Sequence, residues 1–354
     1  MKAVGFKSFG GPEVLEVMEV PEVIPGLGEI RIRNYASAVN PTDIVSRSGL
    51  VAQFQKDFLL PCVPGMDIAG VVDQVGEGVQ TDIKVGDNVM GMVVPKGDHG
   101  AYREQIILDQ NAVVKSPKNA SHIEACTLPM NGLTARLSLD LLDLKPRQVI
   151  AVTGGPGAYG GYVIQLAKAD GLTVIADSNE NDKELLNDLG VDHIIQRGND
   201  FSEVIREIYP DGVDGIADGA LLNELAIDAV KDGGAFTSVR GFKGEPQRNI
   251  NFSATWVVAY NCDYEKIDTI SQQVEDGKGN IIFDPNQGRG VLLRNETKTD
   301  NSWIKIRLEG TKSNRDGFGT IVKIHAGDKI QKQTLSSGQG YFSNNAKELY
   351  FGCL

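Results

Sequence analysis

Short runs of alternating apolar and polar residues dominate the chain up to about Ser116. Three of them are EIRIRNYASAV (29–39), IAGVVDQVG (68–76) and NVMGMVV (88–94), and Gly, Pro and Asp residues separate them. An alternation with period two is typical of a strand that buries one face. Because these runs are short and closely spaced, they predict a compact β-barrel rather than a parallel sheet.

The pattern changes after about residue 120, where apolar runs of strand length alternate with helix-like runs. The expected strands are 148–153, 172–178, 191–196, 212–219 and 234–242, and the expected helices are 161–171, 182–190, 200–210 and 221–233. Ser121 is expected to cap an earlier helix, because Glu124 stands at the spacing of a capping box. Strands that alternate with helices predict parallel crossovers, and therefore a doubly wound α/β domain.

A third pattern follows the Gly-, Pro- and Asn-rich stretch at 276–290. Apolar and polar residues alternate with period two in 302–310, 319–327 and 348–354, without a long helical run between them. That alternation is typical of half-buried antiparallel strands. The end of the chain is therefore expected to form a small antiparallel β module of its own.

The size, charge and cysteine positions of the chain bear on the number of domains, the partners and the compartment. Its 354 residues exceed what one hydrophobic core usually serves, so several domains are expected. A formal net charge of −12 argues against nucleic acids and anionic membranes as partners. There is no run of about 18 apolar residues. The cysteines stand far apart, as is typical of reduced thiols, at Cys62, Cys126, Cys262 and Cys353. These features predict a cytoplasmic protein.

Three glycines between an expected strand and an expected helix carry the first chemical signal. Gly154, Gly157 and Gly160 stand at G-x-x-G-x-x-G spacing. Such a loop lets backbone N–H groups approach a diphosphate, and the following helix adds its positive N-terminal end. We therefore expect these glycines to bind a dinucleotide. A tight turn without a ligand is the alternative, and Pro156 has no N–H to donate.

The end of the next expected strand bears on which dinucleotide is bound. Asp177 is a candidate to accept hydrogen bonds from a ribose 2′-hydroxyl, which favours NAD. Ser178, Lys183 and Arg197 are candidates to hold a 2′-phosphate, which favours NADP. The two cationic side chains make NADP(H) the favoured cofactor, and NAD(H) stays the alternative.

Several motifs together resemble the zinc-free quinone oxidoreductase branch of the medium-chain dehydrogenase/reductase superfamily. They are NPTDIVSRSGL (40–50), PCVPGMDIAGVVDQVGEGVQTDIKVGDNVMG (61–91), GAYREQ (100–105), LPMNGLTA (128–135) and GGPGAYGGYVIQLAK (154–168). The resemblance runs from Met1 to about residue 280. It implies a GroES-like barrel over residues 1–120, a Rossmann domain over residues 121–283, a cofactor between them, and a homodimer.

The resemblance also bears on metal chemistry. Zinc-dependent relatives have Cys where this chain has Asn40, and Gly-His-Glu where it has Gly65, Met66 and Asp67. Without these ligands no catalytic zinc is expected. A metal-free site suits a quinone or another α,β-unsaturated carbonyl, because conjugation spreads the charge that hydride transfer leaves on the acceptor. The resemblance implies that Asn40 and Thr134 border the nicotinamide.

The last part of the chain, residues 286–354, resembles the ASPIC/UnbV module instead of the usual end of the family. The resemblance rests on SWIKIRLEGTKSNRDGFGTIVKI, the SGQGYFS turn and the closing LYFG, and it implies a protein partner. The segment GVLLRN (290–295) is a candidate to replace the missing return strand.

The sequence as a whole leaves two candidate functions. One is an NAD(P)H-dependent quinone or enone reductase, and the other is a nucleotide-binding interaction protein with a degenerate active site.

Overall fold

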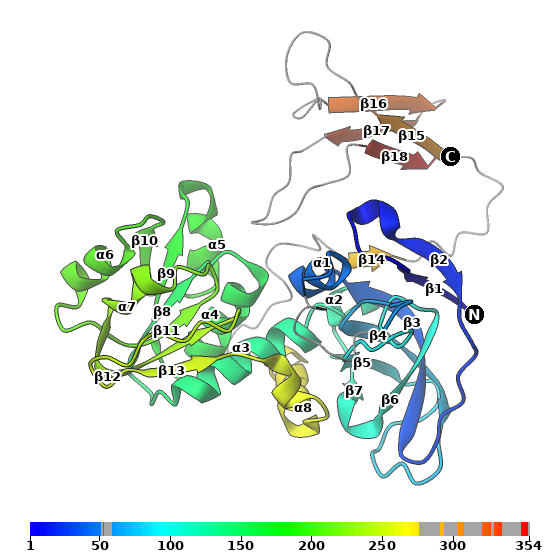
Figure 1. The fold of residues 1–354 in the computed structure, drawn as a ribbon, viewed down its shortest axis with the longest axis horizontal. Coiled ribbons are helices and arrows are strands. Elements are labelled where there is room, and N and C mark those ends of the chain that lie inside the picture. Colours follow the sequence, from blue (N-terminus) through cyan, green and yellow to red (C-terminus); the bar gives the residue numbers. More distant parts are fainter. Residues whose placement is uncertain are drawn as a thin grey trace. The chain divides into compact units, whose positions relative to one another are not determined.

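The computed structural model describes residues 1–50, 52 and 59–275, together with the backbone of five short strands beyond them. The chain divides into two compact units. One consists of Met1–Gly10 and Val14–Leu293, and the other of Gly11–Glu13 and Arg294–Leu354. The first unit contains a curled antiparallel sheet and a parallel sheet (Figure 1). In the described part of the chain, no helix has the length and apolar character needed to span a bilayer.

The N-terminal third of the chain forms the antiparallel sheet. Its strands, in hydrogen-bonded order, are β14 (Val291–Leu293), β3 (Glu29–Ala38), β4 (Asp67–Val75), β5 (Asn88–Met92) and β7 (Val113–Lys115), and β6 (Gln105–Asp109) also pairs with β3. Alternate residues such as Ile30, Ile32 and Ile106 are completely buried in one core. The barrel expected from the period-two pattern is confirmed.

Strand β14 reaches this sheet from the far end of the first unit. It pairs antiparallel with β3, so that Val291 lies opposite Ala38 and Leu293 lies opposite Ala36. Strand β6 pairs only with residues 29–33 of β3, and β14 therefore supplies backbone partners for the rest of that edge. Since β14 lies within 290–295, the expected replacement strand is confirmed.

The middle of the first unit is a parallel sheet of six strands. They are β8 (Val149–Thr153), β9 (Thr173–Ser178), β10 (His193–Gln196), β11 (Val213–Asp218), β12 (Val230–Ser238) and β13 (Asn251–Ala254). All neighbours are parallel, in the order β10-β9-β8-β11-β12-β13. This is the doubly wound order of a Rossmann domain, with its switch point between β8 and β11. The predicted α/β fold class is confirmed.

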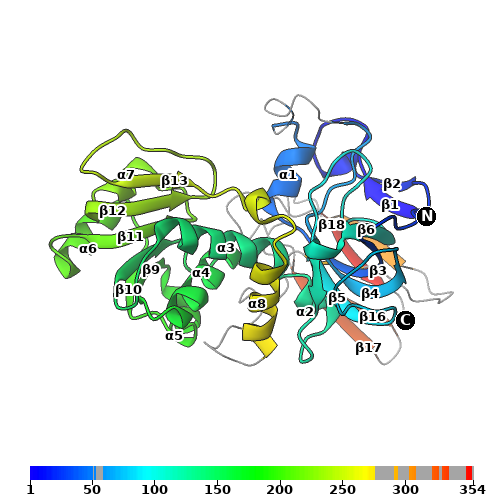
Figure 2. The ribbon, with the colours of Figure 1, turned by 90° about the horizontal axis from the view of Figure 1, so that it is seen from below.

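Helices cover both faces of this sheet (Figure 2). They are α3 (Pro129–Leu142), α4 (Ala158–Ala169), α5 (Lys183–Asp188), α6 (Phe201–Ile208) and α7 (Glu224–Ile227). Ile150 and Val152 of β8 belong to one buried cluster with α3 and α4, whereas Ala151 belongs to a second cluster with α6 and α7. Because successive side chains of a strand point to opposite faces, β8 is apolar throughout.

One predicted helix is wrong. The pattern at 221–233 indicates a helix, but only the single turn α7 is helical, and β12 begins at Val230. The carboxylate of Asp218 accepts hydrogen bonds from the backbone N of Leu222 (3.0 Å) and of Asn223 (2.8 Å), and the φ of Asn223 is 51°. The backbone therefore turns around Asp218 instead of continuing as a helix, and Val230 packs as a buried strand residue.

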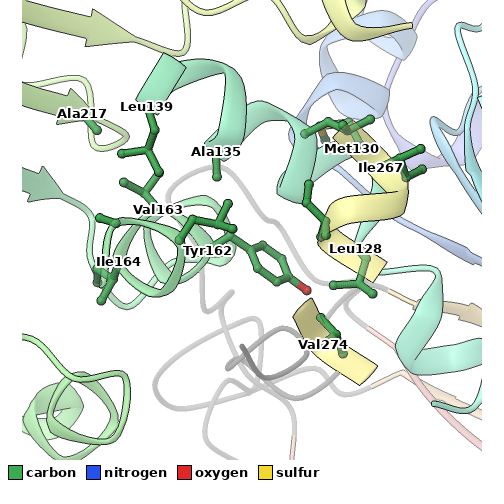
Figure 3. Close-up of a cluster of buried hydrophobic side chains, with 14 of the residues drawn as sticks. Leu128, Met130, Ala135, Leu139, Tyr162, Val163, Ile164, Ala217, Ile267 and Val274 are labelled. Atoms are coloured by element: carbon green, nitrogen blue, oxygen red, sulfur yellow. The ribbon is translucent and has the colours of Figure 1, made fainter. Parts of the chain in front are cut away.

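Helix α3 is buried on nearly all sides, so its sequence lacks the alternation of apolar and polar faces by which a surface helix is recognised. Tyr162 of α4 is completely buried, and its ring extends past Leu128 toward Val274 of α8 (Tyr264–Glu275) (Figure 3). The hydroxyl oxygen of Tyr162 lies 3.1 Å from that of Thr127. Helices α3, α4 and α8 therefore share one core, and Tyr162 lies at its centre.

In the part of the second unit that the structure describes, there are two antiparallel strand pairs. Strand β15 (Trp303–Arg307) pairs with β18 (Glu348–Gly352), and β16 (Ile321–Ala326) pairs with β17 (Lys329–Thr334). The expected antiparallel β module is confirmed. The pattern does not reveal β17, because KIQKQT contains too few apolar residues to show a buried face.

Replacement of Tyr162 tests how much the shared core stabilises the fold. Tyr162→Ala is expected to lower the free energy of unfolding by about 3–5 kcal/mol, because it leaves a cavity among buried side chains. Tyr162→Phe keeps the ring and loses a hydroxyl contact, so its expected loss is only about 1 kcal/mol. Urea unfolding of the wild type and both variants measures these losses. Equal losses for the two variants would contradict the packing role.

Candidate active site

The glycine loop lies after β8, at the switch point of the parallel sheet. Gly154 has a φ of 70°, which residues with a side chain rarely adopt. A Cβ at Gly160 would lie 2.3 Å from the carbonyl oxygen of Gly154, so α4 approaches the loop this closely only without a side chain. Gly157 is the N-cap of α4 and has no side chain to cap it. The first N–H groups of α4 are thus left for another acceptor.

The carboxylate of Asp177 holds the glycine loop. Asp177 lies near the end of β9 and is 1 % exposed. Its Oδ1 accepts hydrogen bonds from the backbone N of Gly154 (2.5 Å) and of Gly155 (3.3 Å), and its Oδ2 accepts one from Nε of Arg197 (2.9 Å). The structure therefore brings together Asp177 and Arg197, which the sequence presents as alternatives. Arg197 balances the charge of the buried carboxylate.

Ser178 and Lys183, the other two candidates to bind the ribose 2′-phosphate, have different surroundings. Ser178 is buried, and its hydroxyl donates to the carbonyl oxygen of Asn179 (2.7 Å). Lys183 is the first residue of α5, and its Nζ lies 2.7 Å from a carboxylate oxygen of Glu180. Both side chains of this ion pair are solvent-exposed, so the pair is weak and leaves the ammonium of Lys183 available to a stronger anion.

The carboxyl edge of the parallel sheet fits a dinucleotide. The uncapped N-terminal end of α4 is a favourable place for a diphosphate. Ser238 ends β12 at the same edge and is completely buried, and within the described residues its Oγ has no hydrogen-bond partner. A buried hydroxyl without a partner costs free energy, and this atom therefore indicates a ligand or water at the edge.

Asn40 belongs to a second polar network, between the barrel and α3. The residue is 2 % exposed and immediately precedes α1 (Pro41–Arg47). Its Nδ2 donates to Oδ2 of Asp67 (2.6 Å), and its Oδ1 accepts from Nδ2 of Asn131 (3.0 Å). The other oxygen of Asp67 accepts from the backbone N of Met130 (2.6 Å). Since Met130 and Asn131 lie in the first turn of α3, the network ties this turn to the barrel.

Burial dominates the electrostatics of Asp67. The side chain is completely buried, and desolvation raises its pKa to about 7, although hydrogen bonds from Met130 and Asn40 act in the opposite direction. The nearby charge of Asp43 also raises it. Asp43 accepts a hydrogen bond from the hydroxyl of Tyr102 (2.9 Å), and burial raises the pKa of Asp43 as well. Two buried acids therefore lie within one network.

Thr134 lies one turn further along α3, and its hydroxyl is turned toward the helix backbone. The hydroxyl donates to the carbonyl oxygen of Met130 (2.6 Å), and the residue is buried. The structure therefore connects Thr134 and Asn40 to the same turn of α3, through Met130. Because the only hydroxyl proton of Thr134 is donated to Met130, the Thr134 oxygen can accept a hydrogen bond from a ligand but cannot donate one.

The structure shows the surroundings of the positions that the family resemblance aligns with zinc ligands. They hold the amide of Asn40, the thioether of Met66 and the carboxylate of Asp67, whose oxygens already accept two N–H groups. Zinc sites are built from thiolate, imidazole and carboxylate ligands. In the described ranges, the His, Cys, Asp and Glu side chains do not gather in any group of three or more that would hold a metal ion.

A chain of hydroxyl groups links the start of α4 to α3. Tyr159 donates to Oγ of Ser138 (2.7 Å), which lies 2.9 Å from Oγ1 of Thr255. Burial raises the pKa of Tyr159, so the phenol stays neutral. No local sequence pattern reveals this chain, because its members belong to α4, α3 and the segment after β13.

Three family models match the chain. Residues 26–118 match the alcohol dehydrogenase GroES-like domain, residues 158–271 match the zinc-binding dehydrogenase family, and residues 310–353 match the ASPIC and UnbV family. The first match lies in the barrel, and the second covers most of the parallel sheet.

Two curated plant proteins are similar to most of the chain. The 2-methylene-furan-3-one reductase of Solanum lycopersicum is 33 % identical over 295 residues, which is 80 % of this chain and 72 % of that protein. The chloroplastic NADPH-dependent alkenal/one oxidoreductase of Arabidopsis thaliana is 32 % identical over 295 residues, with the same coverage of both chains.

Solved structures share the fold. An alcohol dehydrogenase superfamily protein from Novosphingobium aromaticivorans is 25 % identical with a TM-score of 0.71, and the match covers 78 % of this chain and 88 % of that one. The quinone oxidoreductase from Coxiella burnetii is 26 % identical with a TM-score of 0.67, again over 78 % and 88 % of the two chains.

The contact between Gly160 and Gly154 gives a direct test of the loop. Gly160→Ala is expected to weaken dinucleotide binding by at least about tenfold, because the new Cβ forces α4 away from the loop. Gly132→Ala is the matched control, since a Cβ there meets its nearest neighbour, in Ile270, at an ordinary 3.4 Å. Fluorescence titration with NADPH measures both affinities. Equal affinities of the two variants would contradict this reading of the loop.

Proposed function

The chain belongs to the quinone oxidoreductase branch of the medium-chain dehydrogenase/reductase superfamily, and we propose that it transfers hydride from a nicotinamide dinucleotide to a quinone or another α,β-unsaturated carbonyl. The observation that carries this proposal is the glycine loop at the switch point of the parallel sheet, next to an uncapped helix N-terminus. The names of the two plant relatives, an NADPH-dependent alkenal/one oxidoreductase and a 2-methylene-furan-3-one reductase, support the same substrate class.

The proposed roles follow from the surroundings of each residue. Gly154, Gly157, Gly160 and the first turn of α4 hold the diphosphate, and a bound nicotinamide supplies the hydride. Asn40 and Thr134 border the ring. A conjugated acceptor takes the hydride at a carbon of its conjugated system, and the charge that develops spreads to its oxygen, where hydrogen-bond donors stabilise it. Water supplies the proton that completes the reduction.

We propose NADP(H) as the preferred cofactor. Asp177 is turned toward Gly154 and Gly155, and both of its oxygens are engaged, so it is a poor acceptor for a ribose 2′-hydroxyl. Its charge is balanced by Arg197, which lowers the repulsion of a 2′-phosphate. The guanidinium of Arg197 and the exposed ammonium of Lys183 supply positive charge at the same end of the sheet, and Ser178 completes this group.

The proposal also covers the compartment, the oligomeric state and the domain division of the protein. The free thiols of Cys62, Cys126 and Cys262 suit a reducing compartment such as the cytoplasm. Strand β13 is an edge strand of the parallel sheet, which suits a homodimer. We propose three domains, residues 1–120, 121–283 and 286–354, although residues 291–293 of the last one pair with the barrel strand β3. We also propose a protein partner for the last segment.

A substrate panel tests the proposed function. With NADPH present, the purified full chain is expected to reduce quinones and enones, and to leave saturated ketones unchanged, because only conjugated acceptors spread the developing charge. The loss of NADPH absorbance measures the rates. A metal chelator is expected to leave the rates unchanged. Absence of NADPH oxidation with every conjugated acceptor would contradict the proposal.

Replacement of Arg197 tests the cofactor preference. Arg197→Ala is expected to lower kcat/KM for NADPH about 10- to 100-fold and to change kcat/KM for NADH little, because a charge-assisted hydrogen bond to the 2′-phosphate is lost. Arg136→Ala, which removes an arginine paired with Asp140 and Asp170, is the control and is expected to affect both cofactors alike. Equal losses with NADPH and NADH in Arg197→Ala would show that the arginine only supports Asp177.

A further inference from the structure

Asp67 has no role in the proposed reaction, although it lies at the centre of the Asn40 network. It is the first residue of β4 and completely buried. Each of its carboxylate oxygens accepts one N–H group at 2.6 Å, from Nδ2 of Asn40 and from the backbone N of Met130. One carboxylate thus contacts both the amide expected at the nicotinamide and the first turn of α3.

Both partners of Asp67 are donors, and this decides which protonation state fits. An ionised carboxylate accepts both N–H groups, whereas a protonated carboxyl brings an O–H that finds no acceptor in either partner. To accept from that O–H, the Asn40 amide would have to turn over and present its Oδ1.

Asn40 cannot turn over alone. Its Oδ1 already accepts a hydrogen bond from Nδ2 of Asn131 (3.0 Å), and reversal would place two NH₂ groups against each other. Asn131 would have to reverse as well. The ionised carboxylate of Asp67 therefore fixes the orientation of two amides, only one of which it contacts.

We propose that Asp67 is a positioning residue of the reduction, whose ionised carboxylate holds the Asn40 amide in one orientation at the nicotinamide and ties it to the first turn of α3. This inference rests on the proposed function, which supplies the place of Asn40 beside the nicotinamide. In the held orientation, Asn40 keeps its second N–H and a further lone pair for the cofactor or the acceptor. The reversed amide exchanges donor and acceptor, and it therefore pairs wrongly with the same groups.

The groups around Asp67 determine when it is ionised. Asp43 on α1 is the acid that acts on it, and its charge disfavours ionisation. Tyr102, from the segment before β6, and Cys126, directly after α2 (His122–Ala125), also interact with it. Burial raises the pKa of both, so they remain neutral. The positive end of α3 favours the anion, and the balance leaves Asp67 with a pKa of about 7.

The inference predicts a separation of turnover from cofactor binding. As the pH falls through about 7, Asp67 takes up a proton and releases the Asn40 amide, so kcat is expected to fall. The affinity for NADPH is expected to change much less than kcat over the same range, because the glycine loop and Asp177 do not contact this network. A kcat without this acid limb would contradict the inference.

Asp67→Asn tests the carboxylate with little change of shape. It replaces one acceptor oxygen by an NH₂ group that faces another donor, so kcat is expected to fall about 10- to 100-fold and to lose its acid limb. Asp73→Asn is the matched control in the same strand. Asp73 accepts from Nε of Arg31 (2.8 Å) and from Nε2 of Gln105 (3.0 Å), away from Asn40, and its variant is expected to keep the wild-type pH profile.

A double-mutant cycle shows whether Asp67 acts through Asn40. In an Asn40→Ala background, Asp67→Asn is expected to cause no further loss of kcat, because the amide that it positions is absent. Losses that multiply in the double variant would overturn the inference, since they would show that the two residues act independently.

An NMR titration tests the carboxylate without turnover. In protein labelled with ¹³C-aspartate, one carboxyl resonance is expected to titrate near pH 7, to persist in Asp73→Asn and to be missing in Asp67→Asn. If Asp67→Asn does not fold, Asn40→Ala replaces it, and loss of that donor is expected to raise the midpoint. Absence of such a resonance in an active enzyme would overturn the inference. The resonance in a protein that does not oxidise NADPH would overturn the proposed function instead.

Discussion

The close approach of α4 to the loop after β8 is the constraint on which the site depends. There is no room for a Cβ at Gly160 beside the carbonyl oxygen of Gly154, and Asp177 holds the backbone N of Gly154 from the other side. The loop is thereby fixed between a strand and a helix, and the N-terminal end of α4 stays directed at the carboxyl edge of the sheet. Ser238, whose hydroxyl has no hydrogen-bond partner in the part of the chain that the structure describes, lies at the same edge.

Two buried carboxylates, Asp177 and Asp67, have surroundings that differ in charge. Asp177 accepts three N–H groups, and one of them belongs to the cation Arg197, so its ionised form is compensated. Asp67 accepts only two neutral N–H groups and lies near a second acid, Asp43. The first arrangement fixes the backbone of the glycine loop, where the diphosphate is proposed to bind. The second gives a carboxylate whose charge responds to pH near neutrality, at the place where the reaction is proposed to occur.

The sequence predicts five of the six strands of the parallel sheet, most clearly β8 and β9, which are buried along most of their length and largely apolar. It misses the edge strand β13, whose sequence NFSA has no apolar run. It also fails where a side chain outside an expected element decides the backbone: Asp218 of β11 turns the chain at Leu222, and the helix expected at 221–233 is reduced to one turn. The sequence does not reveal helix α3 by its pattern, because the helix is buried on nearly all sides. The glycines are visible as a motif, whereas the link from Asp67 to Met130 spans 63 residues of sequence and appears only in three dimensions.

Amide hydrogen exchange with and without NADPH tests most directly whether a backbone cradle at the start of α4 receives a diphosphate. NADPH is expected to slow exchange in residues 158–160, whose N–H groups would become hydrogen-bonded to phosphate oxygens, while exchange in the six-stranded sheet away from this edge stays unchanged. Saturating NADPH that leaves residues 158–160 unprotected, or protects only a segment elsewhere, would contradict a diphosphate site at this helix end.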